Sequence, residues 1–157
     1  MVIDIIVFSR KNMRVSKMVD LDSNVHSVFK LWYHLVMVVK YRRKVIDSDI
    51  SIKLKEMFLN ISPAYNITLC EWNYEEDHVH VLFRAHPKSE ISKFINAYKS
   101  ASSRIIKKEY PEVREKLWKE YFWSPSFCLI TAGGAPLEVL KEYIKTQGEK
   151  LSSGKTT

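Results

Sequence analysis

From residue 31 onward, the apolar positions of this chain fall into runs with strand-like or helix-like spacing. Residues 31–39 are rich in aromatic and β-branched side chains and predict a buried strand. Asp47 or Ser48 can cap a helix that ends before Pro63. The apolar residues that recur at helical spacing in this second segment are Ile50, Leu54, Met57, Phe58 and Ile61.

The middle of the chain predicts an antiparallel hairpin followed by a helix. A strand over residues 66–74 leads through the acidic turn 75–77 into a strand that begins at His78. In this second strand the side chains alternate between two faces, and the apolar set needs a cover. A helix that is opened by Ser89 and stopped by Pro111 supplies it. The apolar stripe of that helix consists of Ile91, Phe94, Ile95, Tyr98, Ala101 and Ile105.

The following segments predict a short helix over residues 112–119 and a last strand over residues 121–130. This strand is expected to be irregular at Pro125, because proline has no backbone donor for the ladder. The order strand, helix, strand, strand, helix, strand predicts an α+β fold of the ferredoxin-like or RRM-like type, with an antiparallel sheet and helices on one face.

A final helix is expected over residues 136–149, after two glycines that permit a swivel or simply form a loop. Tyr143 and Gln147 are four residues apart and therefore share one side of this helix. The helix can lie across the free face of the sheet. We thus divide the chain into an N-terminal extension (1–27), one domain (28–150) and a flexible tail (151–157), which suits 157 residues with 46% hydrophobic content.

The formal charge of +7 favours a polyanionic partner, nucleic acid before membrane, although a solvated basic surface is an open alternative. Four cations surround an aromatic residue at the end of the first strand, where they can hold phosphates while the ring stacks on a base, or can simply solubilise the strand end. Trp118, Phe122 and Trp123 can be stacking platforms or core residues. The four cations and their aromatic residue are Lys40, Tyr41, Arg42, Arg43 and Lys44.

The apolar stretch 1–8 is too short to cross a bilayer and is followed, not preceded, by basic residues. We therefore expect no export signal and no membrane helix. Cys70 and Cys128 stand alone in apolar runs, which favours buried, reduced thiols. Together these features indicate a cytoplasmic protein.

His78 and His80 carry the chemistry that the pattern suggests first. On a strand they point to the same face, and neutral imidazole is a common ligand of divalent metals. Two ligands make only half a site, and such a pair also occurs on ordinary half-exposed strand faces. His34 is interpreted as an ordinary strand histidine.

Several motifs, in this order and spacing, resemble the single-tyrosine HUH transposases of minimal bacterial and archaeal insertion sequences, the IS200-like transposases. The resemblance covers residues 28–150, while the longer N-terminal stretch 1–27 departs from the family pattern. The motifs are Tyr33-His34-Leu35-Val36, Lys40-Tyr41-Arg42-Arg43-Lys44, Asp77-His78-Val79-His80, Lys99-Ser100-Ala101-Ser102-Ser103-Arg104, and Tyr143 with Gln147.

The resemblance implies that Tyr143 is the nucleophile and that His78, His80 and Gln147 hold Mg²⁺ or Mn²⁺. It implies a homodimer in which the tyrosine helix can complete the neighbouring subunit's site. The substrate would be single-stranded DNA with a folded hairpin at the element ends. Contacts to DNA are expected from Lys99, Ser103 and Arg104 in addition to the cationic strand end.

The function expected is therefore a DNA transposase that cleaves and rejoins single strands through a covalent 5′-phosphotyrosine. Two classes of alternative stay open, a binding module and another type of HUH enzyme. One is a ferredoxin-like module that binds single-stranded nucleic acid without catalysis. The other is a domesticated HUH nickase that acts on chromosomal repeats, or a replication-initiator nickase.

Overall fold

The computed structural model describes residues 22–23 and 27–131. The expectations for the final helix, with Tyr143 and Gln147, and for the two glycines and the tail lie outside the described residues. So does most of the N-terminal extension.

An antiparallel four-stranded sheet forms the centre of the fold, in the order β4-β5-β3-β6, and a two-stranded ribbon of β1 and β2 precedes it. Strand β3 is central because it pairs with β5 on one side and β6 on the other. The strands are β1 (Asp22–Ser23), β2 (Val28–Phe29), β3 (Leu31–Val38), β4 (Ile67–Glu75), β5 (His78–Ala85) and β6 (Cys128–Thr131).

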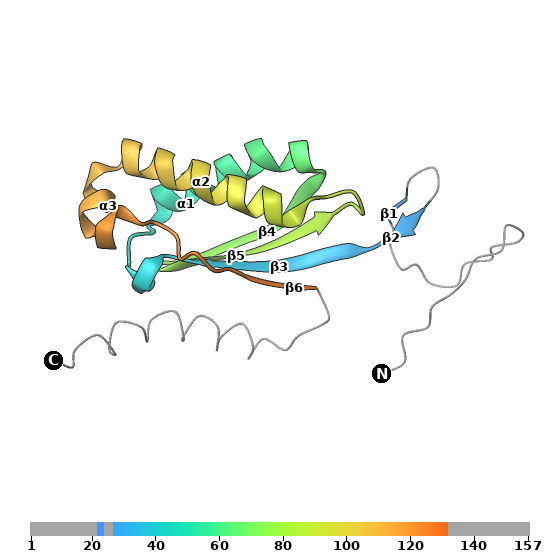
Figure 1. The fold of residues 1–157 in the computed structure, drawn as a ribbon, viewed down its shortest axis with the longest axis horizontal. Coiled ribbons are helices and arrows are strands. Elements are labelled where there is room, and N and C mark those ends of the chain that lie inside the picture. Colours follow the sequence, from blue (N-terminus) through green and yellow to red (C-terminus); the bar gives the residue numbers. More distant parts are fainter. Residues whose placement is uncertain (1–21, 24–26, 132–157) are drawn as a thin grey trace, which may run out of the picture.

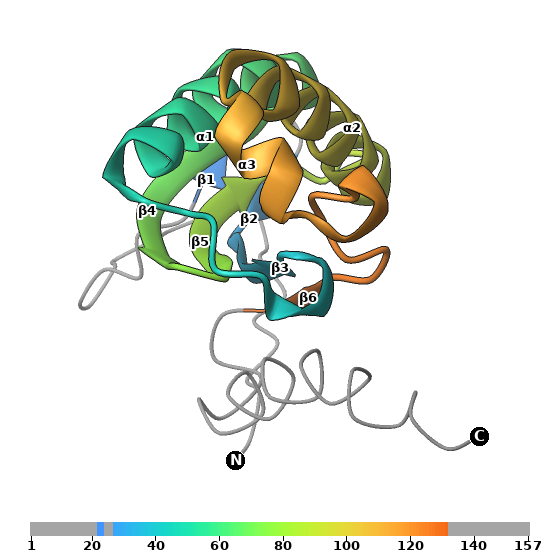
Figure 2. The ribbon, with the colours of Figure 1, turned by 90° about the vertical axis from the view of Figure 1, so that its left-hand side faces the viewer.

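Helices α1 (Ser48–Ile61) and α2 (Ile91–Glu109) lie side by side on one face of this sheet (Figure 1), and the end-on view in Figure 2 shows the same two layers. The order β3, α1, β4, β5, α2, β6 confirms the predicted ferredoxin-like fold. The remaining helical pieces are α3 (Pro111–Lys116) and the 3-10 turns η1 (Lys40–Arg42), η2 (Ser62–Tyr65) and η3 (Trp118–Glu120).

Local sequence accounts for the bounds of the first helix. The side-chain Oδ1 of Asp47 accepts a 2.9 Å hydrogen bond from the backbone nitrogen of Ile50, as expected for an N-cap. The helix passes directly into η2, where Pro63 cannot donate to a further helical turn. The predicted start and end of α1 are confirmed.

The core fills the space between the sheet and the two helices. On β5 the side chains of Val79, Val81 and Phe83 are fully buried, whereas those of the alternate residues are only partly covered. Phe58 of α1 packs against Phe83 and Phe94 with ring centroids 6.3 and 5.0 Å away. Burying each such side chain contributes about 1.5–3 kcal/mol, which fixes the register of β5 and hence the face that its histidines occupy.

Helix α2 differs from the prediction at two points. Glu90, not Ser89, is its N-cap residue; Ser89 instead accepts a hydrogen bond from the backbone of His86 and donates one to the carbonyl of Asn66. Near the other end Ile106 is buried and Ile105 is only partly buried, because Ile106 continues the four-residue spacing of the buried residues Tyr98 and Ser102.

The last strand and the cysteines also differ from the prediction. Strand β6 spans only Cys128–Thr131, since the segment before it is irregular apart from a single bridge between Val39 and Trp123. Cys70 is exposed and Cys128 is partly exposed, so the expectation of buried thiols was wrong, although both are free. Cys70 lies on the edge strand β4 where the register with β5 shifts between Leu69 and Glu71. Within the described ranges no helix is both long and apolar enough to span a bilayer.

Candidate active site and nucleic-acid interface

His78 and His80 occupy the sheet face opposite α1 and α2, as the alternation of β5 predicted. Their neighbours across the ladder on β3 are Val38 and Val36. Both valines are fully buried, and the side chain of His78 is 14% exposed. The two imidazoles therefore lie beside buried valines and are partly shielded from water.

Asp77 fixes one of these rings. Its Oδ1 lies 2.8 Å from Nδ1 of His78, and its Oδ2 accepts a 2.7 Å hydrogen bond from Nε of Arg42. Burial of the carboxyl group opposes its ionisation, but the hydrogen bonds from His78 and Arg42 outweigh burial and lower the pKa of Asp77. Asp77 is consequently a carboxylate whose two oxygens are both engaged.

Backbone contacts hold the turn that carries Asp77. The carbonyl of Asp77 accepts a 2.9 Å hydrogen bond from the backbone nitrogen of Val39. The carbonyl of Glu76 accepts hydrogen bonds from Val45 and Ile46, at 2.9 and 2.8 Å. The β4–β5 turn is thus attached to the segment that follows β3, which brings the predicted cationic strand end next to the histidines.

His34 contacts the second histidine of the pair. Its Nδ1 lies 3.1 Å from Nε2 of His80, with ring centroids 5.2 Å apart. Burial lowers the pKa of His80, and the nearby His34 and His78 lower it further, so His80 is neutral at pH 7. The sequence pattern alone indicates an ordinary strand histidine at His34. The contact depends on the register of β3 against β5, which single-strand periodicity does not contain.

The donor set fits a divalent metal in part. Neutral His80 and the oriented ring of His78 are the ligand forms that metals require. The part of the chain described by the structure holds no group of three His, Cys, Asp or Glu side chains placed to bind a metal. Further ligands must come from elsewhere, and the roles of Gln147 and Tyr143 stay predictions.

The cationic strand end divides into differently engaged residues. Arg42 is bound to Asp77, and Nζ of Lys44 lies 3.7 Å from a carboxylate oxygen of Glu76 with both side chains exposed. Nζ of Lys40 lies 4.8 Å from the ring centroid of Tyr41, and that ring makes an edge contact with Trp118. Arg43 is exposed. The predicted DNA contacts of these residues remain predictions.

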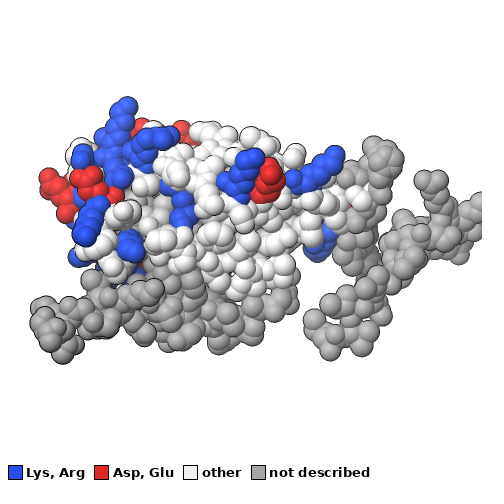
Figure 3. All heavy atoms as spheres, in the orientation of Figure 1, with Lys and Arg blue, Asp and Glu red and all other residues white. Residues whose placement is uncertain are grey.

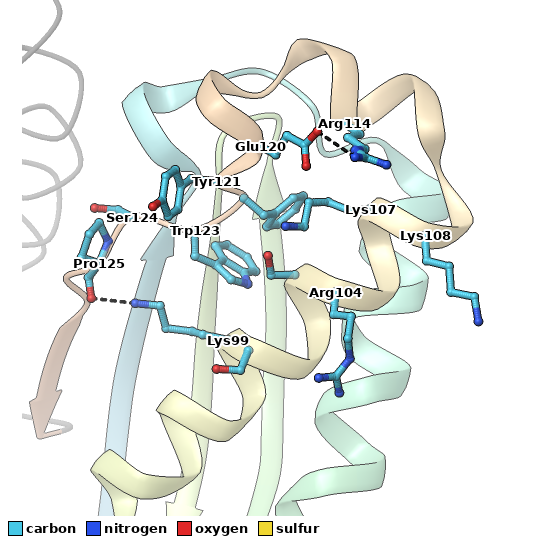
Figure 4. A pocket seen from close by; sticks show the side chains of 13 residues that line it. Lys99, Arg104, Lys107, Lys108, Arg114, Glu120, Tyr121, Trp123, Ser124 and Pro125 are labelled. Carbon is cyan, nitrogen blue, oxygen red and sulfur yellow. Dashed lines mark hydrogen bonds and ion pairs between the residues drawn. The ribbon is translucent and has the colours of Figure 1, made fainter.

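A second basic region lies between α2 and the segment that follows α3, where the surface forms a pocket of about 670 Å³ (Figure 4). We call it the α2 pocket. Lys99 crosses it and donates a 2.8 Å hydrogen bond to the carbonyl of Pro125, and its partial burial lowers the pKa of Lys99. The residues that line the α2 pocket are Lys99, Ser100, Ser103, Arg104, Lys107, Lys108, Arg114, Glu120, Tyr121, Phe122, Trp123, Ser124 and Pro125.

The structure therefore brings together the predicted residues Lys99, Ser103 and Arg104, and adds cations to them. Lys107 and Lys108 belong to the same helix, and their spacing of three and four residues from Arg104 is the signal that could have found them. Arg114, which is paired with Glu120 at 2.8 Å, could not have been found this way. Figure 3 shows cationic side chains gathered where α2 meets α3, with acidic side chains among them.

Comparisons of sequence find relatives among transposases. A family model described as "Transposase IS200 like" matches residues 27–147. The ISDra2 transposase TnpA of Deinococcus radiodurans is 34% identical over 123 residues, which cover 78% of this chain and 88% of the relative. The transposase for insertion sequence element IS200 of Salmonella typhimurium is 25% identical over 135 residues, or 86% of this chain and 88% of the relative.

Comparisons of structure agree with this. A crystal structure from Deinococcus radiodurans R1, described as that of a transposase, superimposes with a TM-score of 0.71 at 29% identity, and covers 80% of this chain and 97% of its own. A tyrosine transposase bound to a REP hairpin shares the fold, with a TM-score of 0.52 at 10% identity over 85% of this chain and 74% of its own.

Proposed function

Because this chain belongs to the family of IS200-like transposases, whose model matches residues 27–147, we propose that it cleaves and rejoins single-stranded DNA through a 5′-phosphotyrosine on Tyr143. The observation that carries the proposal is the pair His78 and His80. They share the sheet face opposite the helices, and the buried carboxylate of Asp77 holds the first of them.

The covalent step uses the phenol of Tyr143. A phenol has a pKa of about 10 and is a weak nucleophile until it is positioned and loses its proton. Its oxygen forms a bond to the scissile phosphorus while the bond from phosphorus to the 3′ oxygen breaks. The departing oxygen takes up a proton and becomes a 3′-hydroxyl. One phosphoester replaces another, so a second 3′-hydroxyl can reverse the step without an external energy source.

The metal site of the proposal consists of His78, His80 and Gln147. A bound Mg²⁺ or Mn²⁺ would polarise the scissile phosphate and neutralise the charge that develops on it. The residues of the chain prepare this site. The lowered pKa of His80 keeps that ring uncharged, and Asp77 orients the ring of His78.

The α2 pocket and the cationic strand end, apart from the Asp77-bound Arg42, supply the DNA-binding part of the proposal. Arg104, Lys107 and Lys108 can neutralise phosphates, and the exposed ring of Tyr121 can stack on a base. We propose single-stranded DNA with a hairpin as the substrate. A homodimer whose tyrosine helix can act in the neighbouring subunit completes the proposal.

The test is an adduct assay with a single-stranded oligonucleotide that carries an element end and is labelled at its 3′ end, because the fragment that runs to the 3′ end is the one that stays on the tyrosine. We expect labelled protein on a denaturing gel in Mg²⁺ or Mn²⁺ and none in EDTA. Tyr143→Phe should abolish the adduct, whereas Tyr74→Phe, which changes an exposed tyrosine on β4, should retain it. An adduct that persists in the Tyr143→Phe variant would exclude the assigned nucleophile. DNA binding without any adduct would favour the non-catalytic binding module.

Complementation between inactive variants tests the action of the helix in the neighbouring subunit. Tyr143→Phe protein is mixed with His78→Ala protein and exchanged into mixed dimers. If the tyrosine of one subunit serves the histidines of the other, one site of each mixed dimer contains both defects and the second site contains neither. Activity should then return. If each subunit uses its own tyrosine, both sites carry one defect and the mixture stays inactive.

A further inference from the structure

We propose that Arg42 is a positioning residue and not a phosphate ligand: together with Asp77 it holds the ring of His78 in the form that can bind a metal. This inference rests on the proposed metal site. It starts from one unbroken set of contacts, in which Nε of Arg42 donates to Oδ2 of Asp77 at 2.7 Å and Oδ1 of Asp77 lies 2.8 Å from Nδ1 of His78.

The geometry determines which nitrogen of His78 is free. An ionised carboxylate has no proton to donate, so Nδ1 of His78 must carry the hydrogen of the 2.8 Å contact. A neutral imidazole has only one N–H group. In that uncharged form Nε2 holds the unshared electron pair and is the atom left to bind a cation. Partners of this kind fix the tautomer and the orientation of metal-binding histidines.

The burial of Asp77 explains why Arg42 matters to this arrangement. The side chain of Asp77 is only 7% exposed, so little water can solvate it. Removal of Arg42 would leave one oxygen of a mostly buried carboxylate without its charged partner, and an unpaired buried charge is costly. The carboxylate would then rotate toward solvent, which weakens its hold on His78.

Arg42 lies in a turn with unusual backbone angles, and its side chain is 36% exposed where it reaches Asp77. Tyr41 and Arg42 have φ values of 56° and 52°, a region that residues other than glycine seldom adopt. The backbone nitrogen of Arg42 donates a 2.8 Å hydrogen bond to the carbonyl of Val39, which closes the turn. Lys44, in contrast, lies 3.7 Å from the exposed Glu76, with its side chain 72% exposed.

The cationic strand end therefore contains two kinds of residue. Arg42 points to the carboxylate beneath the metal site, and Lys44 remains at the surface. Neutralising either one removes the same charge from the same short segment. Lys44→Gln is thus a matched control for Arg42→Gln. Both changes should weaken DNA binding through the lost charge, but only Arg42→Gln should weaken metal binding.

The experiment measures Mn²⁺ binding to the full chain by calorimetry without DNA, so that phosphate contacts do not enter. We expect Asp77→Asn to weaken binding by about 10- to 100-fold, the range found for residues that hydrogen-bond to metal-binding histidines. Arg42→Gln and Arg42→Lys should also weaken it, because lysine cannot present Nε in the same place. Lys44→Gln should leave the affinity within about twofold of the wild-type value.

Nitrogen-15 NMR of the histidine rings gives a second readout that does not require metal. We expect the Nδ1–H form of His78 in the wild type and a mixture of tautomers in the Asp77→Asn variant. If wild type and the Asp77 and Arg42 variants bind Mn²⁺ equally, the inference is overturned. If only Asp77→Asn weakens binding, the part assigned to Arg42 is wrong. A wild type that binds no Mn²⁺ would overturn the proposed metal site, and the tautomer spectra would still decide the inference.

Discussion

The indole Nε1 of Trp123 donates a 2.9 Å hydrogen bond to the hydroxyl of Ser102, which is fully buried in α2. The same segment is tied to the sheet, because the backbone nitrogen of Ser124 donates to the carbonyl of Val38 at 2.8 Å. The segment with Trp123 and Ser124, which lines the α2 pocket, is therefore connected both to α2 and to β3, the strand that precedes the cationic strand end.

Replacing Ser102 by alanine should destabilise the protein. The buried indole N–H would lose its acceptor, and an unsatisfied buried donor costs about 1–3 kcal/mol. We expect the urea midpoint to fall accordingly. Ser103→Ala is the control: Ser103 is a neighbouring, partly exposed residue of the same helix, and its replacement should change stability by less than about 0.5 kcal/mol. Equal effects of the two changes would contradict the role given to the Trp123 contact.

Neutralising Arg104 and Lys107 should weaken DNA binding in a salt-dependent way. Each lost contact to a single-stranded phosphate should make the plot of log affinity against log salt shallower by about 0.7. Fluorescence anisotropy with a labelled oligonucleotide at several salt concentrations measures both quantities. Lys55→Gln, on α1 and outside the α2 pocket, removes a charge without a proposed contact. A slope that is unchanged in the Arg104→Gln and Lys107→Gln variants would place the DNA elsewhere.

The sequence predicted the fold well because the fold depends on local regularities. The alternation of β5 and the helical spacing of α1 are each visible within the short stretch of sequence that forms the element. Asp47, as N-cap, and Pro63, which lacks a backbone donor, mark the two ends of α1. Strand β6 was overestimated because Phe122 and Trp123 have the composition of a strand but are buried in an irregular segment. Composition alone does not separate these two environments.

The arrangement of the candidate site residues was predicted where they belong to one strand and missed where it depends on strand pairing. His78 and His80 share a face through their spacing in the sequence. The contacts of His34 with His80, and of Arg42 with Asp77, join residues 46 and 35 positions apart. Only the register of the sheet and the path of the β4–β5 turn bring them together. Arg42 for this reason looked like one of several equivalent surface cations.

Removal of the His34 side chain should weaken metal binding at His80. We take Nε2 of His80 as the donor in its 3.1 Å contact with Nδ1 of His34, which leaves Nδ1 of His80 to bind the cation. The contact also limits rotation of the His80 imidazole, and its loss lowers the fraction of rings with Nδ1 aimed at the cation. We expect His34→Ala to reduce Mn²⁺ affinity by about tenfold and His34→Gln, which keeps a hydrogen-bonding group, to reduce it less. Tighter binding by the His34→Ala variant would show instead that His34 competes with the metal for Nε2 of His80.

Tyr98 should make the stability of the protein sensitive to alkaline pH. This residue is fully buried beneath α1, where its hydroxyl donates a 2.9 Å hydrogen bond to the carbonyl of Leu54. Burial raises the pKa of Tyr98 well above its usual value near 10, despite an opposing hydrogen bond with Ser102. Tyr98→Phe should cost about 1 kcal/mol at pH 7 through the lost hydrogen bond.

The sign of the pH effect follows from the protons bound in each state. Below pH 10 Tyr98 is protonated in both the folded and the unfolded chain and adds no pH dependence. Above pH 10 the unfolded chain loses this proton while the folded one keeps it, so the folded state binds more protons and stability falls as pH rises. The Tyr98→Phe variant lacks this loss, and its deficit relative to wild type should shrink between pH 9 and about 11 in urea unfolding. Tyr74→Phe, at an exposed position, should follow the wild-type pH profile. A Tyr98→Phe deficit that stays constant over this range would mean that Tyr98 ionises equally well in the folded protein.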